Sequence, residues 1–180
     1  LSLYYAGRLS EQKNLHNLLW GIHLYIKQTG DRNLTLDLFG EEDRLGSPNM
    51  GMGPLEYRQI LQNLVEEFDI QDVVTFHGHV AREEISDRIS PGKKVFVSLS
   101  LHSDENFGMA ALRALSCGHQ AILSNWGGHG DFVRNFSNRV HSVPVYVSST
   151  GPFTSLHRFV ESIKRAKGFK NSDPPNVSET

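Results

Sequence analysis

The strongest constraint on the fold is a regular alternation along the chain between short apolar stretches and longer amphipathic ones. The longer stretches place apolar side chains at helical spacing, as in residues 14–27, a helix that Gly30 is expected to end, and 54–68. The short stretches are typical of strands, and they cover residues 3–6, 33–40, 73–79, 93–100 and 120–124. Strands that alternate with helices predict a parallel sheet with helices on both faces. The expected fold class is therefore α/β, with a doubly wound parallel sheet.

The remaining stretches continue this pattern. Further helices are predicted over residues 82–89, 127–136 and 155–167, and one within 103–118, after Glu105. A last strand is predicted over 140–147. Pro144 would place that strand at an edge. We expect one domain over residues 1–167 and a polar, disordered tail over 168–180. Because the sequence opens inside a strand-like stretch, "LSLYYAGR", we expect it to be a piece of a longer protein.

Parallel sheets bind their ligands beyond the carboxyl ends of the strands. The loops that begin at Gly7, Gly40, Gly78, Leu101 and Asn125 follow the predicted strands. We therefore expect these loops to line one edge of the sheet, and we expect any functional site to lie there.

Composition bears on the class of function. The 180 residues carry a formal net charge of −2, without the basic excess typical of nucleic-acid binding, so no nucleic-acid partner is expected. Cys117 is the only cysteine, which rules out an intramolecular disulfide. No apolar stretch is long enough to cross a bilayer. We expect a cytoplasmic protein, and association of the full-length protein with a membrane surface stays open.

The first candidate site is "GRLSEQKN", where Arg8 follows the glycine that ends the first strand and Lys13 precedes the next helix. An arginine fork, a lysine charge and the N–H groups of a helix end together suit a diphosphate. On the spacing alone, two solvated surface cations are the favoured interpretation of this stretch.

The second candidate is "SDENFGMAALRALSCG", residues 103–118. Here Glu105 precedes a helix whose first turn is predicted to contain Phe107 and Gly108. Glycine allows close approach of a ligand to the backbone, and a carboxylate accepts hydrogen bonds from sugar hydroxyls. The alternative is that Asp104 or Glu105 only caps the helix.

The nine histidines raise the question of a metal site. His77 and His79 lie on one face of a predicted strand end, an arrangement that suits zinc. No third and fourth ligand follow at a recognisable spacing, so we expect no metal and no cofactor. Trp126 precedes the tight turn at Gly127-Gly128, and core packing is favoured for it over stacking on a ligand ring.

Five stretches in order resemble the carboxyl-terminal half of the group 1 (family 4) glycosyltransferases, which have the two-domain GT-B fold. They are "YAGRLSEQKNL", "LDLFGEE", "VTFHGHVAREEI", "VFVSLSLHSDENFGMAALRALSCG" and "AILSNWGGHGDFV", within residues 3–133. The resemblance implies a Rossmann-like domain that binds the nucleotide diphosphate of a sugar donor. It also implies an acceptor-binding domain that precedes this one, an unknown acceptor hydroxyl, retention of anomeric configuration and no metal.

The resemblance also implies roles for individual residues. Arg8 and Lys13 would hold the phosphates, and Glu105 would contact the donor sugar; these three are the expected catalytic residues. Gly7, Phe107 and Gly108 would complete the donor site together with Arg113. Arg113 stands at the position where the family usually has a second glutamate, which holds the ribose hydroxyls.

Arg113 departs from the family pattern, because arginine has no acceptor for hydroxyl protons. Three explanations are open: another group holds the ribose, the donor differs, or donor affinity is lost. The last corresponds to an alternative function, a degenerate, non-catalytic domain that binds nucleotide or glycan. A flavodoxin-like signalling domain would need a carboxylate cluster after the first strand, where this chain has Gly7-Arg8.

Overall fold

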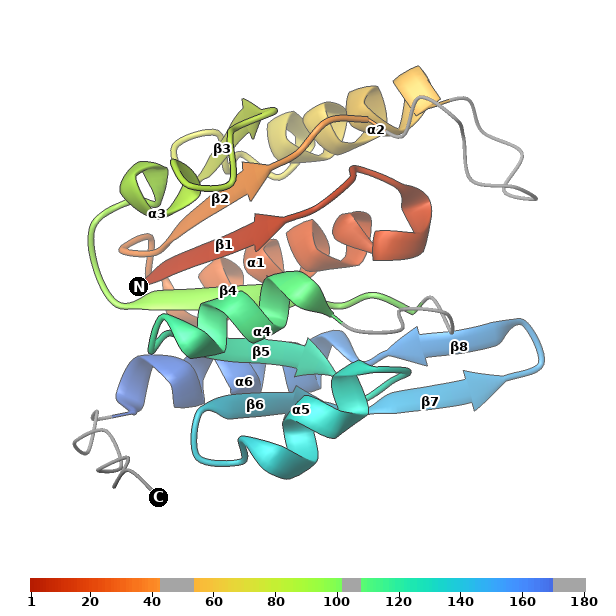
Figure 1. Ribbon diagram of the computed structural model, residues 1–180. Helices are drawn as coiled ribbons and strands as arrows, with labels where there is room; N and C mark the ends of the chain where they lie inside the picture. The colour runs from red at the N-terminus through yellow and green to blue at the C-terminus, as the bar shows by residue number, and fades with distance from the viewer. Residues whose placement is uncertain (43–53, 102–107, 170–180) are drawn as a thin grey trace.

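The computed structural model describes residues 1–42, 54–101 and 108–169. A six-stranded sheet forms its centre, with the strand order β3-β2-β1-β4-β5-β6 and parallel pairing throughout (Figure 1). The strands are β1 (Ser2–Ala6), β2 (Thr35–Phe39), β3 (Val74–Gly78), β4 (Lys94–Ser98), β5 (Gln120–Ser124) and β6 (Val140–Val143). This is the Rossmann strand order, so the predicted doubly wound α/β fold is confirmed.

Helices cover both faces of the sheet (Figure 1). One face carries α1 (Leu15–Thr29), α2 (Pro54–Glu67) and α6 (Leu156–Gly168), and the other carries α3 (Ile85–Arg88), α4 (Met109–Ser116) and α5 (His129–Asn135). A short 3-10 helix, η1 (Glu11–Lys13), leads into α1. None of the helices in the described ranges is long and apolar enough to cross a bilayer.

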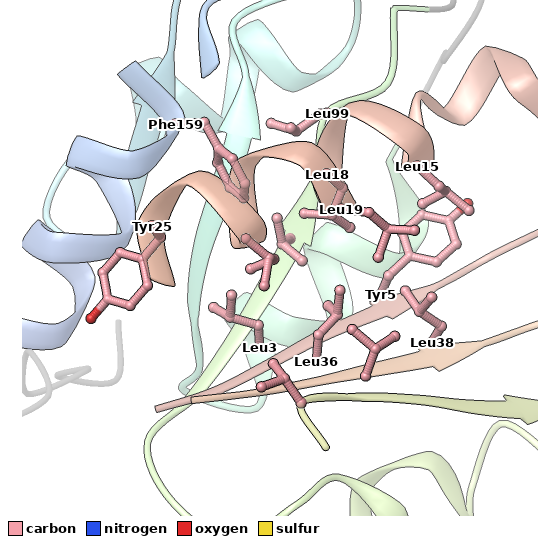
Figure 2. Packing of buried hydrophobic residues seen from close by; sticks show 14 of the residues in the cluster. Leu3, Tyr5, Leu15, Leu18, Leu19, Tyr25, Leu36, Leu38, Leu99 and Phe159 are labelled. Carbon is pink, nitrogen blue, oxygen red and sulfur yellow. The ribbon is translucent and has the colours of Figure 1, made fainter. Parts of the chain in front are cut away.

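The face under α1 and α6 holds the larger apolar core. Side chains of α1 point onto the leucines of β1 and β2, as Figure 2 shows for Leu15, Leu18 and Leu19. Helix α1 ends where the sequence predicts, at Gly30, whose φ of 66° is left-handed and whose N–H donates to the Ile26 carbonyl at 2.8 Å. The core side of α1 therefore has the length and the end that its sequence pattern specifies.

A glycine fixes how closely α1 and α6 approach each other. A Cβ on Gly21 would lie 2.2 Å from Cδ1 of Phe159, a distance that real atoms do not reach. The Phe159 ring is fully buried and lies beside α1 (Figure 2). The absent side chain at position 21 is thus what admits this ring.

The sequence prediction is wrong at one point near the end of the domain. The stretch 140–147 is not one strand: β6 joins the edge of the parallel sheet, and after Pro144 the chain forms β7 (Val145–Ser148), which pairs antiparallel with β8 (Gly151–Thr154). Proline lacks an N–H and cannot continue a ladder, so the chain changes partner there. Residues 170–180 lie outside the described ranges, and the domain boundary at residue 167 stays a prediction.

Candidate functional site

The order of the strands determines where a crevice opens. β1 and β4 are neighbours in the sheet, but the helices that follow them cover opposite faces. The chain after β1 turns towards α1, and the chain after β4 leads to α4 (Figure 1). The connections therefore diverge at the carboxyl ends of these two strands, which is the topological switch point at which open α/β sheets bind ligands.

A cavity of about 290 Å³ lies at this switch point. Its walls include four of the predicted site residues: Gly7, Arg8, Lys13 and Gly108. These residues come from two connections about one hundred positions apart in sequence, one after β1 and one before α4. The structure thus brings the first and second candidate stretches together around one space.

Hydrogen bonds hold the two connections in place. The Tyr5 hydroxyl donates to the Arg8 carbonyl at 2.9 Å, which fixes the turn after β1. Asn14, which is buried with a left-handed φ of 58°, donates through Nδ2 to the Leu99 carbonyl at 3.0 Å. The backbone N–H of Leu101 donates to the Gln12 carbonyl at 3.3 Å. The loop that carries Arg8 and Lys13 is therefore tied directly to the end of β4.

Gly108 stands at the start of α4, and its place differs from the prediction. It is the N-cap residue and not part of the first turn, since the helix begins at Met109. Its φ of 46° is left-handed, and a Cβ there would lie 2.9 Å from Cε2 of Phe132. The first helical bond runs from the Leu112 N–H to the Gly108 carbonyl at 3.0 Å. The N–H groups before Leu112 are left without acceptors inside the helix, as at any helix start.

A second, larger cavity of about 590 Å³ adjoins the first and shares Ala6, Gly7, Arg8 and Ala110 with it. Its walls include Arg113, the last of the predicted residues within the described ranges. Glu41 and Glu42 also line it, from the segment after β2. That segment is fixed by a backbone bond from Leu9 to the Glu41 carbonyl at 2.8 Å.

A third cavity, of about 220 Å³, lies beyond Arg113 between α3 and α4. Its lining is mainly apolar, and at one end Tyr4 and His119 are joined by a 2.8 Å contact between the hydroxyl and Nδ1. Burial raises the pKa of Tyr4 and, together with the charge of Lys94, lowers the pKa of His119. Both groups are therefore neutral near pH 7.

Sequence reasoning missed His129, which is buried and lines the first cavity. Ser124 Oγ donates its only hydrogen to the Ser100 carbonyl at 2.7 Å, so it accepts from His129 Nδ1 at 3.1 Å. His129 Nδ1 thus carries a hydrogen. The available signal was position: His129 closely follows β5, at the same sheet edge as the other site residues.

The two histidines considered for zinc do not form a shared site. His77 contacts Asp37 through Nε2 at 2.7 Å and stacks on Phe39, whereas His79 lines the 590 Å³ cavity. Within residues 1–42, 54–101 and 108–169 no group of three or more metal-ligating side chains comes together. Trp126 is half-buried, consistent with the packing role expected of it.

Two predicted site residues, Glu105 and Phe107, lie outside the described residues, as does Asp104. Their proposed roles therefore stay predictions. The prediction that the loops after the strands line one edge is confirmed in part. Among the described residues, the cavities are lined by the connections after β1, β2 and β3 and by the first residues of α4 and α5.

Known proteins share this sequence pattern and fold. Residues 2–149 match the family described as "Glycosyl transferases group 1". The chain is 29% identical over 122 residues to mannosylfructose-phosphate synthase from Agrobacterium fabrum, an alignment that covers 68% of this chain and 25% of that protein.

Solved structures agree with this match. Sucrose-phosphate synthase from Thermosynechococcus elongatus superposes with a TM-score of 0.69 at 26% identity, over 92% of this chain and 36% of that chain. The Anabaena protein HepE in complex with UDP has the same fold, with a TM-score of 0.66 at 17% identity, over 92% of this chain and 38% of that chain. This chain thus spans about a quarter to two fifths of the length of these proteins.

The Rossmann strand order, the site at the switch point between β1 and β4, and a family match over most of the chain lead to one assignment. The chain belongs to the group 1 glycosyl transferases, and its fold is that of a Rossmann-like half of a GT-B enzyme.

Proposed function

We propose that this domain binds the nucleoside diphosphate sugar donor of a glycosyltransferase, which moves the sugar to an acceptor hydroxyl with retention of anomeric configuration. The observation that carries the proposal is the 290 Å³ cavity, which Gly7, Arg8, Lys13 and Gly108 line together. Two cations and a helix start around one cavity of this size suit a diphosphate.

The chemistry of the leaving group gives each residue a role. When the bond between sugar and diphosphate breaks, negative charge grows on the phosphate oxygens. Arg8 can hold two of these oxygens with its planar fork, and Lys13 adds a point charge. The N–H groups at the start of α4 add fixed dipoles, which stabilise developing charge without reorganisation. Glu105 would contact the sugar hydroxyls from the segment that precedes Gly108 in the sequence.

A donor screen tests the proposal. Calorimetry with UDP-, GDP- and ADP-sugars, and with the corresponding nucleosides, measures whether the diphosphate contributes to binding. UDP-sugars form the first arm because the Anabaena fold relative was solved with UDP and with UDP-glucose. We expect at least one nucleotide sugar to bind, and to bind more tightly than its nucleoside. Binding of no nucleotide in any arm would contradict the proposal.

We further propose that sugar transfer needs a second domain that binds the acceptor. A closed, dry site between two walls is what positions a donor against an acceptor, and the cavities described here lie at one edge of a single sheet. The purified 180-residue chain should therefore bind donor without transferring sugar. Acceptor-dependent transfer by this chain alone, at the rate of a full-length enzyme, would contradict this part.

A second candidate function is a degenerate domain that binds nucleotide or glycan without catalysis. Its support is Arg113, which lines the 590 Å³ cavity. The family usually has a glutamate at this position. A full-length protein that binds donor yet neither transfers nor hydrolyses it would favour this second candidate.

A further inference from the structure

We propose that Arg82 and Arg113 form a second anion subsite, which binds a phosphate monoester next to the diphosphate site. The inference rests on the proposed function in one respect: it takes the 290 Å³ cavity as the diphosphate site. The ligand class is a nucleotide that carries an additional phosphate on its ribose. A separate sugar phosphate offers the same chemical group from a second source.

The two arginines stand at the partition between two cavities. Both line the 590 Å³ cavity, and both also line the mainly apolar 220 Å³ cavity between α3 and α4. Ala6, Ile85 and Ala110 are the other residues that the two cavities share. Among the described residues, the two guanidinium groups are thus the only charged groups in this shared wall. They come from separate segments, the connection after β3 and the second turn of α4.

The balance of charge differs on the two sides of the partition. The 590 Å³ cavity also holds Arg8, Glu41 and Glu42, so its formal charges nearly cancel. The described lining of the 220 Å³ cavity contains no carboxylate, and its Tyr4 and His119 are neutral near pH 7. An anion at the partition therefore meets two positive charges with apolar atoms behind them, where electrostatic attraction is stronger than in water.

The guanidinium groups are also available for a ligand. Neither Arg82 nor Arg113 has a hydrogen-bond or ion-pair partner among the described residues, although Arg113 is half-buried. Nearby arginines are paired instead: Arg88 with Glu84 at 3.0 Å and Arg134 with Asp131. Arg82 is exposed, so the cost of burial concerns Arg113, whose charge is partly removed from water and is stabilised by a partner of opposite charge. An anionic ligand would supply the missing partner.

A phosphate monoester fits this pair better than a hydroxyl does. It carries a charge of about −1.5 to −2 at pH 7 and three acceptor oxygens, enough for two guanidinium forks. A ribose hydroxyl needs an acceptor for its proton, which neither arginine has. The position fits too, because both Arg8, which also lines the 290 Å³ cavity, and Arg113 line the 590 Å³ cavity, and a nucleoside is of the size that such a cavity holds.

Calorimetry on the purified chain tests the subsite with four probes: ADP, its 2′-phosphate derivative, its 3′-phosphate derivative and glucose 6-phosphate. We expect one of the two ribose-phosphorylated nucleotides to bind roughly ten- to a hundred-fold more tightly than ADP. In Arg113→Ala and in Arg82→Ala this ratio should fall several-fold, and Arg113→Lys should retain part of it. Arg165→Ala, on α6 across the sheet, removes an equal charge and should leave the ratio unchanged.

The outcomes separate the inference from the proposed function. If ADP binds in an Arg8-dependent way and the added phosphate brings no gain, the subsite is refuted and the donor site stands. If glucose 6-phosphate binds in an Arg113-dependent way and the nucleotides gain nothing, the subsite stands with a separate sugar phosphate as its ligand. If no phosphorylated probe shows dependence on Arg113, with thermal melting showing the variants folded, the inference is overturned whether or not ADP binds.

Discussion

The two faces of the sheet are built differently. On one face, α1 and α6, with 15 and 13 residues, pack against a continuous apolar core from Leu3 to Ala166. On the other face, α3, α4 and α5 have 4, 8 and 7 residues, and the apolar cluster beneath them is smaller. The helix α4 and the connections around it border three cavities on that second side.

The contrast shows how one small domain combines stability with binding. Long helices bury continuous apolar stripes, which is the main source of folding free energy. Short helices cover less of the sheet and leave space between their ends and the strand ends. Cavities lower the free energy of unfolding, because packing contacts are missing around them. A domain tolerates cavities when an apolar core elsewhere in the molecule provides enough stability. The α1/α6 face has that role here, and the α4 face carries the candidate binding site.

The largest expected effect lies on the packed face. Phe159→Ala should lower the free energy of unfolding by about 3–5 kcal/mol, because the buried ring fills the space beside Gly21 and no neighbour can replace it. Denaturant melting measures the loss. Affinity for nucleotide should stay the same under conditions in which the variant is folded, because the ring lies across the sheet from the cavities.

Phe132→Ala is the matched change on the cavity face. Its ring is only half-buried, so the loss of stability should be smaller than for Phe159→Ala. The ring lies beside Gly108, at the start of α4, so this variant should instead weaken nucleotide binding. A larger loss of stability for Phe132→Ala than for Phe159→Ala would contradict the conclusion that the α1/α6 face is the main source of stability.

Removal of a positive charge at the switch point should weaken ligand binding and leave the stability of the fold nearly unchanged. Arg8→Ala and Lys13→Ala should each weaken nucleoside diphosphate binding by about 1.5–3 kcal/mol, because each removes a charge-assisted contact. Nucleoside binding and the melting temperature should change much less. Calorimetry with diphosphates and nucleosides checks both variants. Unchanged diphosphate affinity in both would identify the two residues as surface cations.

Arg113→Glu should change which nucleotides the 590 Å³ cavity binds most tightly. The variant has two acceptor oxygens in place of a guanidinium, so binding of ribonucleotides over 2′-deoxyribonucleotides should improve by about 1.5–3 kcal/mol at most. Repulsion between the new carboxylate and the diphosphate, partly offset by Arg8 and Lys13, reduces that gain. The natural protein should discriminate poorly between the two nucleotide forms. An equal affinity of the variant for both would show that position 113 does not face the ribose.

The smallest effect concerns pH and involves both faces. Burial lowers the pKa of His16 on α1, of His119 at the apolar cavity and of His141 on β6 below the ordinary value of 6.5. The unfolded chain therefore binds more protons than the folded one below about pH 6.5, and stability falls as pH drops through that value. Melting temperatures measured from pH 7.5 to pH 5 should decline. His119→Gln and His141→Gln should each make the melting temperature less dependent on pH. If neither variant changes the decline, other titrating groups cause it.

Much of the fold follows from the sequence because its signals are local. Helix α1 was predicted with its end at Gly30, since a run of apolar residues at helical spacing and a glycine that adopts a left-handed φ lie within one short stretch. Gly7, Arg8 and Lys13 were placed at the carboxyl edge of a parallel sheet for the same reason: strand alternation determines which loops meet.

The tertiary structure decided what depends on contacts between distant segments. The sequence did not show that Arg82 and Arg113 would line the same two cavities, because the two lie 31 positions apart in the chain and only the tertiary structure places the connection after β3 near α4. It did not show that His129 faces the first cavity, or that the chain after Pro144 leaves the sheet to form β7 and β8. Residue period and turn chemistry are read within a few residues, whereas cavities and shared walls arise from the packing of whole elements. The sequence therefore determined the α/β architecture and the edge that carries the diphosphate-binding candidates, and the tertiary packing decided which charged residues line the same cavities at that edge.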